Sequence, residues 1–103
     1  MPIPTTDPII VAPTNMPFRE DESLDLGALA RNIDKFCETA LSGFVVGSYG
    51  GEEFHIGEPE KVSAISTVGK AHAGRRFVIA GIDALSPAEA VRLANIYADA
   101  GAD

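Results

Sequence analysis

The alternation of apolar runs with helical patterns is the feature that most limits what this chain can fold into. Three short apolar runs begin at Ile9, Gly43 and Arg76, and their starts lie 34 and 33 residues apart. A helical pattern follows each run. Continuous apolar strands joined by helical connections are typical of a parallel sheet covered by helices. We therefore predict an α/β fold of three strand–helix units of similar size.

The expected strands are the runs at 9–13, 43–48 and 76–81. Apolar residues spaced three or four apart predict a first helix beginning near Asp25, with Ser23 or Asp25 as its cap. Its buried face is expected to be Leu26, Leu29, Ile33, Phe36 and Ala40.

The second and third helices have recognisable starts. Pro59 sits in the first turn of the second, and Ser86 to Glu89 form a capping-box pattern at the start of the third. Gly101 is expected to end the third helix. The predicted buried stripes are Val62, Ile65 and Val68 in the second helix, and Val91, Ala94, Tyr97 and Ala98 in the third.

Three units make an incomplete sheet. A three-stranded parallel sheet has two bare edges and little core, whereas a complete (β/α)₈ barrel needs about 250 residues. We expect residues 1–8 to be an extended lead-in. Residues 9–103 are expected to be the N-terminal part of a larger α/β protein, cut before a fourth strand. A small complete three-layer α/β domain is the alternative.

Charge and composition exclude several classes of partner. Fifteen acidic residues against eight Lys and Arg give a net charge of −7, which argues against nucleic acid and anionic membranes. No apolar run approaches the roughly 20 residues of a membrane span. The start MPIPTTDP lacks the features of a signal peptide, and one cysteine fits a reducing compartment. A cytoplasmic location is therefore expected.

The loop from Gly47 to Gly57 is the candidate binding site, because sites in parallel α/β folds gather at the carboxyl ends of strands. Its glycines let backbone N–H groups converge on an anion, and Ser48 and Tyr49 add hydroxyl donors. The alternative is a plain flexible connection. The same loop contains Glu52, Glu53 and His55, which could bind a metal ion. A pair of solvated carboxylates beside a helix start is the favoured interpretation.

Three stretches of the chain carry a family resemblance. MPFREDESLDLGALARNIDKF, GFVVGSYGGEEFHIGEPEKVSAI and RFVIAGIDALSPAEAVRLANIYADAGAD resemble the start of the dihydrodipicolinate synthase/N-acetylneuraminate lyase family. The 4-hydroxy-2-oxoglutarate aldolase branch is slightly more similar around GFVV. The resemblance implies a homo-oligomeric (β/α)₈ TIM barrel without a cofactor. It also implies that pyruvate or a related 2-oxo acid forms a Schiff base with a lysine on the sixth strand, assisted by a tyrosine on the fifth.

The resemblance also implies a carboxylate-binding turn after the second strand, Gly-Thr-Thr-Gly-Glu or Gly-Ser-Asn-Gly-Glu in the family. Here Gly51 and Glu52 match the end of that motif. The middle pair falls on Tyr49 and Gly50, and Ser48 takes the place of the first glycine. A shift of one residue would place Ser48 and Tyr49 in the middle. Ser48, Tyr49 and Gly50 are thus the expected substrate-binding residues, with Tyr49 as a possible proton-relay hydroxyl.

The catalytic lysine of the family is not expected within this chain. Lys35, Lys61 and Lys70 all fall on helical patterns with polar neighbours, and we interpret each as a solvated surface charge. The 103 residues alone are therefore expected to be inactive. The alternative from another class is a small non-catalytic α/β module that binds an anion.

Four further residues are assigned structural roles. We expect Cys37 to be a packed small hydrophobe and Tyr97 to belong to the core. His72 falls at the end of the second helix, where a cation interacts favourably with the helix dipole. Asp83 follows the third strand, where a capping or turn role is favoured over contact with a substrate.

Overall fold

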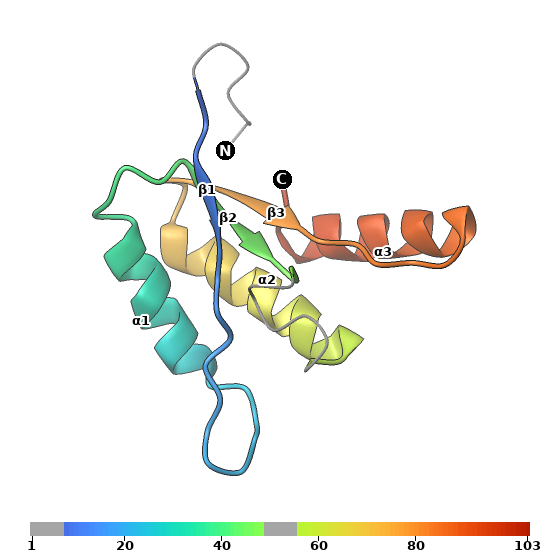
Figure 1. Ribbon diagram of the computed structural model, residues 1–103, viewed down its shortest axis with the longest axis horizontal. Coiled ribbons are helices and arrows are strands. Elements are labelled where there is room, and N and C mark those ends of the chain that lie inside the picture. Colours follow the sequence, from blue (N-terminus) through green and yellow to red (C-terminus); the bar gives the residue numbers. More distant parts are fainter. Residues whose placement is uncertain (1–7, 49–55) are drawn as a thin grey trace.

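The computed structural model describes residues 8–48 and 56–103 and shows an α/β fold of alternating strands and helices (Figure 1). The strands are β1 (Val11–Pro13), β2 (Gly43–Val46) and β3 (Phe77–Ala80), and the helices are α1 (Leu26–Phe36), α2 (Glu58–His72) and α3 (Pro87–Ala100). The predicted order of elements is confirmed. The strands are shorter than expected: Ile9 and Ile10 precede β1 and are exposed.

The sheet is parallel and its strands follow the order of the sequence, β1-β2-β3. Parallel strands joined by crossovers of the same hand, each stepping in the same direction, place their helices on one face of the sheet. Figure 1 shows α1 beside α2 and α3 beyond α2. One core joins all three helices to that face; its largest members include Leu29, Ile33, Phe44, Val46, Ile65, Val68, Val78, Leu93 and Tyr97.

Alternate residues of the strands point to the opposite face of the sheet. Val45 and Ile79 lie there and are only partly buried. A parallel sheet is ordinarily buried on both faces, which is why its strands are apolar throughout. This second face is therefore suited to further packing.

The helix starts follow the predicted chemistry with one difference. Asp25 caps α1, because its Oδ1 accepts a hydrogen bond from the Ala28 N–H at 3.0 Å. Ser86 caps α3 by accepting from the Glu89 N–H at 3.2 Å. The Glu89 carboxylate, however, accepts from Arg92 instead of turning back to Ser86. The predicted capping box is therefore only half formed.

Two predicted buried stripes are partly wrong. Phe36 is 42% exposed and Ala40 lies beyond α1, while Cys37 completes the buried row at four-residue spacing. In α3 the buried residues are Leu93 and Tyr97, whereas Val91, Ala94 and Ala98 are exposed. The apolar surface of α3 is wider than this sheet can cover, because no strand of the described chain pairs with the outer edge of β3.

Candidate functional site

The candidate site lies at the carboxyl ends of the three strands, where Thr14, Gly47 and Gly81 follow β1, β2 and β3. Thr14 is buried, and its N–H donates to the Val45 carbonyl at 3.0 Å, which extends the pairing of β1 with β2. Sequence reasoning missed Thr14. A polar residue directly after a buried strand was the available signal.

Two glycines fix the turn after β2. The Gly81 N–H donates to the Val46 carbonyl at 2.8 Å, and a Cβ on Gly81 would overlap the Gly47 carbonyl oxygen. Gly47 has a φ of +83°, a conformation that favours glycine. The chain therefore leaves β2 in a direction that depends on glycine at both positions.

Ser48 follows this turn and presents an unused polar group. Its Oγ is buried and has no hydrogen-bond partner in the described structure. A buried hydroxyl without a partner is unusual, because native proteins satisfy most buried polar atoms. The other two expected binding residues, Tyr49 and Gly50, lie outside the described residues, as do Glu52, Glu53 and His55. The structure thus places only Ser48 of the predicted set.

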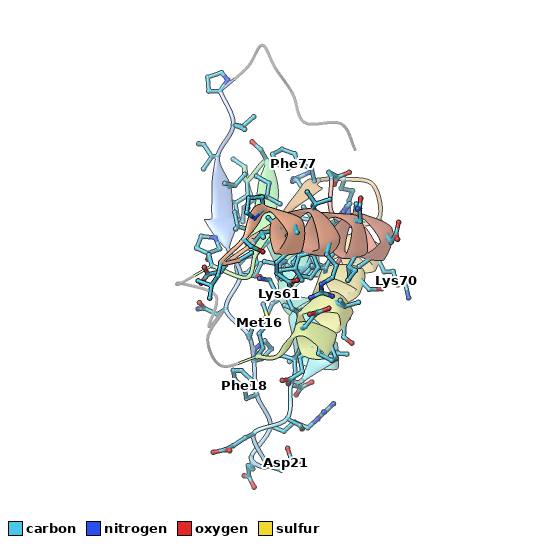
Figure 2. The ribbon with its side chains drawn as sticks, turned by 90° about the vertical axis from the view of Figure 1, so that its right-hand side faces the viewer. Met16, Phe18, Asp21, Lys61, Lys70 and Phe77 are labelled. Atoms are coloured by element: carbon cyan, nitrogen blue, oxygen red, sulfur yellow. The ribbon has the colours of Figure 1, made fainter. Side chains whose placement is uncertain are left out.

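The interpretation of Lys61 as a solvated surface charge is wrong. Lys61 is only 6% exposed, and its Nζ lies 5.1 Å from the centre of the Tyr97 ring. In Figure 2 it lies beneath α3, whereas Lys70 points away from the molecule. The signal was present in the sequence, since Lys61 precedes the buried Ile65 and Val68 by four and seven residues. Lys35 and Lys70 are exposed as predicted.

A pocket of about 300 Å³ lies between the starts of α2 and α3, beside Lys61. Arg92 joins the two helices at its edge by donating to both carboxylate oxygens of Glu58, at 3.1 and 2.9 Å, and to Glu89. These bonds lower the pKa of Glu58 and of Glu89 and raise the pKa of Arg92. The pocket is lined by Ile56, Gly57, Glu58, Lys61, Asp83, Glu89, Leu93 and Tyr97.

Three other predicted residues have clear places. Cys37 is buried at the end of α1, and Tyr97 is 4% exposed within the core, as expected. Asp83 is exposed at the edge of the pocket.

Over residues 8–48 and 56–103, no three His, Cys, Asp or Glu side chains come together in a way that could hold a metal ion. No helix in these ranges is long and apolar enough to cross a membrane.

The interpretation of His72 as a cation at a helix end is also wrong. His72 is 5% exposed, and its Nδ1 accepts a hydrogen bond from the Gly74 N–H at 3.1 Å. Burial lowers the pKa of His72, against the opposing effect of the Asp103 carboxylate. The neutral imidazole is therefore the favoured form, and it lies at the opposite end of the strands from Ser48.

The fold is that of parallel α/β proteins, in which ligands bind at the carboxyl ends of the strands, where this chain has a glycine turn and a buried hydroxyl. The comparison with known families is more specific. The sequence matches the Dihydrodipicolinate synthetase family over residues 7–103, and the chain belongs to this family. The comparisons do not favour the alternative of a non-catalytic module.

Individual relatives agree with this assignment. The chain is 38% identical over 87 residues to a 4-hydroxy-tetrahydrodipicolinate synthase of Laribacter hongkongensis, covering 84% of the chain and 30% of the relative. It is 32% identical to an N-acetylneuraminate lyase of Rhizobium meliloti, covering 82% and 28%. The crystal structure of dihydrodipicolinate synthase from Rhodopseudomonas palustris superposes with a TM-score of 0.80 at 29% identity, covering 90% and 31%. The chain thus spans about a third or less of these proteins.

Proposed function

We propose that this chain supplies the first three strand–helix units of a (β/α)₈ aldolase-type lyase and the carboxylate-binding side of its site for pyruvate or a related 2-oxo acid. The observation that carries the proposal is the Ser48 hydroxyl in the turn after β2, which is buried and has no partner among residues 8–48 and 56–103. That turn aligns with the family motif that holds the substrate carboxylate. Ser48 would donate its hydroxyl proton to the carboxylate, beside Tyr49 and the Gly50 N–H.

The barrel assignment is supported by the one-sided cover of the sheet. All three helices share one core on one face, which is the arrangement of a barrel and differs from a doubly wound sheet with helices on both faces. The outer edge of β3 is already partly engaged, since the Asp103 N–H donates to the Val78 carbonyl at 2.8 Å. A fourth strand beginning near this point would cover the apolar groove beside β3 that Ile82, Ala94 and Ala98 line.

The covalent chemistry is assigned to residues outside this chain. A lysine that attacks a carbonyl must be neutral and must face the substrate at a strand end. Lys35 and Lys70 are exposed on helices, and Lys61 extends from α2 against Gly47. In the whole protein, a lysine amine would condense with the 2-oxo group to form an imine and release water. The imine then accepts the electron pair as a carbon–carbon bond breaks or forms.

The substrate-binding turn differs from the family motif. Gly50 offers only its N–H where the family has a side chain in the middle pair, and Tyr49 carries its hydroxyl on a longer arm. The proposed substrate stays pyruvate or a related 2-oxo acid, in either a dihydrodipicolinate synthase-like or a 4-hydroxy-2-oxoglutarate aldolase-like reaction. Tyr49 is also proposed to relay a proton. We further propose a cytoplasmic homo-oligomer.

Borohydride reduction in the presence of pyruvate tests the proposal, because it converts the imine into a stable amine that mass spectrometry detects. We expect an adduct on the full-length protein that carries this sequence and none on the 103 residues alone. An adduct on the 103-residue chain would overturn the expectation that it is inactive. No adduct on the full-length protein would remove the aldolase assignment.

A further inference from the structure

We infer that Lys61 is a positioning residue for the carboxylate end of this site, an inference that rests on the proposed function. Two features single it out among the described lysines. It is buried on the face of α2 that meets the turn after β2, and it reaches both that turn and α3. Neither Lys35 nor Lys70 is buried.

The Lys61 side chain occupies the space directly beside Gly47. A Cβ built on Gly47 would overlap the Lys61 Cε and would lie only 2.6 Å from its Nζ. On another side, the Gly81 backbone lies against the Gly47 carbonyl. Gly47 is therefore held between the backbone after β3 and the Lys61 side chain. This double contact fixes where Ser48, the next residue, presents its hydroxyl.

The Lys61 ammonium is held in place by the aromatic face of Tyr97. A cation 5.1 Å from the ring centre is within the range of a favourable cation–π interaction. This contact keeps the Lys61 ammonium beside Gly47, one residue from the proposed carboxylate ligand.

A buried positive charge beside the turn attracts the substrate carboxylate more strongly than an exposed one, because water screens it less. Lys61 belongs to α2 and contacts the turn at Gly47, so we assign its contribution to substrate binding. We therefore expect its loss to weaken affinity for pyruvate without slowing imine formation at saturation.

Lys61→Met tests this inference, because methionine keeps much of the side-chain volume and removes the charge. Lys70→Met, on the exposed side of the same helix, is the matched control. The measurement is pyruvate-dependent borohydride inactivation of the full-length protein. We expect Lys61→Met to raise the pyruvate concentration for half-maximal rate about tenfold, with the maximal rate within about twofold of wild type. Lys70→Met should leave both unchanged.

The possible failures are distinguishable. If the wild-type protein is not trapped by pyruvate and borohydride, the proposed function fails and this inference fails with it. If the wild type is trapped and Lys61→Met has an unchanged half-maximal concentration, the positioning role alone is wrong. A fall in maximal rate with an unchanged half-maximal concentration, or an adduct mapped to the Lys61 peptide, also overturns it.

A second measurement covers the case in which Lys61→Met does not fold. Gly47→Ala should destabilise the protein more in the wild-type background than in a Lys61→Ala background, where the space beside Gly47 is open. Equal destabilisation in the two backgrounds would show that Lys61 does not confine the turn, and would overturn the inference without any assay of substrate binding.

Discussion

The two ends of the parallel sheet are built in different ways. At the amino end, Arg76 donates from its NH2 group to the carbonyls of Cys37 and Thr39, at 2.8 and 3.1 Å, and so closes the loop that leads into β2. At the carboxyl end, Ser48 has a buried hydroxyl without a partner in the described structure, and Gly47 has a left-handed backbone. The Arg76 NH2 group thus binds carbonyls of the loop, whereas the Ser48 hydroxyl binds none of the described atoms.

This difference indicates that the amino end of the sheet serves stability and the carboxyl end serves ligand binding. Hydrogen bonds at the amino end stabilise the fold, although Arg76 Nε itself stays without a partner among the described atoms. A buried hydroxyl that binds none of the described atoms is suited to a ligand, because the ligand can supply the missing partner. Parallel α/β proteins place their sites at the carboxyl ends of strands. The comparison therefore predicts which substitutions affect stability and which affect binding.

Gly81→Ala is expected to have the largest effect on stability. The new Cβ would overlap the Gly47 carbonyl oxygen, and the paired backbones cannot separate without breaking the Gly81 N–H to Val46 bond. We expect the free energy of unfolding to fall by about 2–3 kcal/mol. Urea unfolding followed by circular dichroism measures this.

The matched control is Gly74→Ala at the amino end. Gly74 also has a positive φ, of +77°, but nothing lies within 4 Å of a Cβ there. Only backbone strain remains, so we expect a loss of about 1 kcal/mol. Equal losses for the two variants would show that the close contact between Gly81 and Gly47 adds no measurable cost to the substitution.

Arg76→Met is expected to have the next largest effect. The substitution leaves the Cys37 and Thr39 carbonyls without the Arg76 donor, while the methionine retains apolar contact. We expect unfolding free energy to decrease by about 1–2 kcal/mol, with no change in the pyruvate concentration for half-maximal borohydride inactivation. A change in that concentration would contradict the separation of the two ends.

The sequence predicted the alternation and order of the elements because apolar period and capping chemistry are local. Asp25, Pro59 and Ser86 mark helix starts whatever surrounds them. It failed where burial depends on neighbours far along the chain. Val91 was predicted to be core but is 62% exposed, and Lys61 was predicted to be at the surface but lies under α3 in Figure 2.

The candidate site was predicted only in part. The glycine-rich turn after a buried strand pointed to Ser48, because strand tips are where such turns gather. The contacts of Gly47 with Lys61 and with Gly81 bring together three segments that are separated in the sequence. No local pattern reports a contact of that kind. The interpretation of His72 failed for the same reason, since its burial comes from tertiary packing.

The pH dependence of stability tests the amino end further, with a smaller expected effect. Burial holds the pKa of His72 below its ordinary value of 6.5, so the unfolded chain binds a proton that the folded protein resists. We expect the free energy of unfolding to decrease as pH falls from about 6.5 toward the folded-state pKa. His72→Gln should lack this component when urea unfolding is repeated between pH 7 and pH 5. An identical pH profile for both proteins would show that His72 is not protected from protonation.

Ser48→Ala is expected to have the smallest effect on stability and the clearest effect on binding. The Ser48 hydroxyl is buried without a partner, so its removal breaks no hydrogen bond in the described structure. We expect unfolding free energy to stay within about 0.5 kcal/mol of wild type or to rise slightly. The pyruvate concentration for half-maximal inactivation should rise several-fold.

Ser42→Ala is the control and is expected to give the opposite pattern, because the Ser42 Oγ accepts a hydrogen bond from the Ile10 N–H at 3.0 Å at the amino end. It should lower stability and leave pyruvate trapping unchanged. If Ser48→Ala were instead the destabilising variant, the hydroxyl would be a structural group. The proposal that the turn after β2 binds the substrate carboxylate would then be wrong.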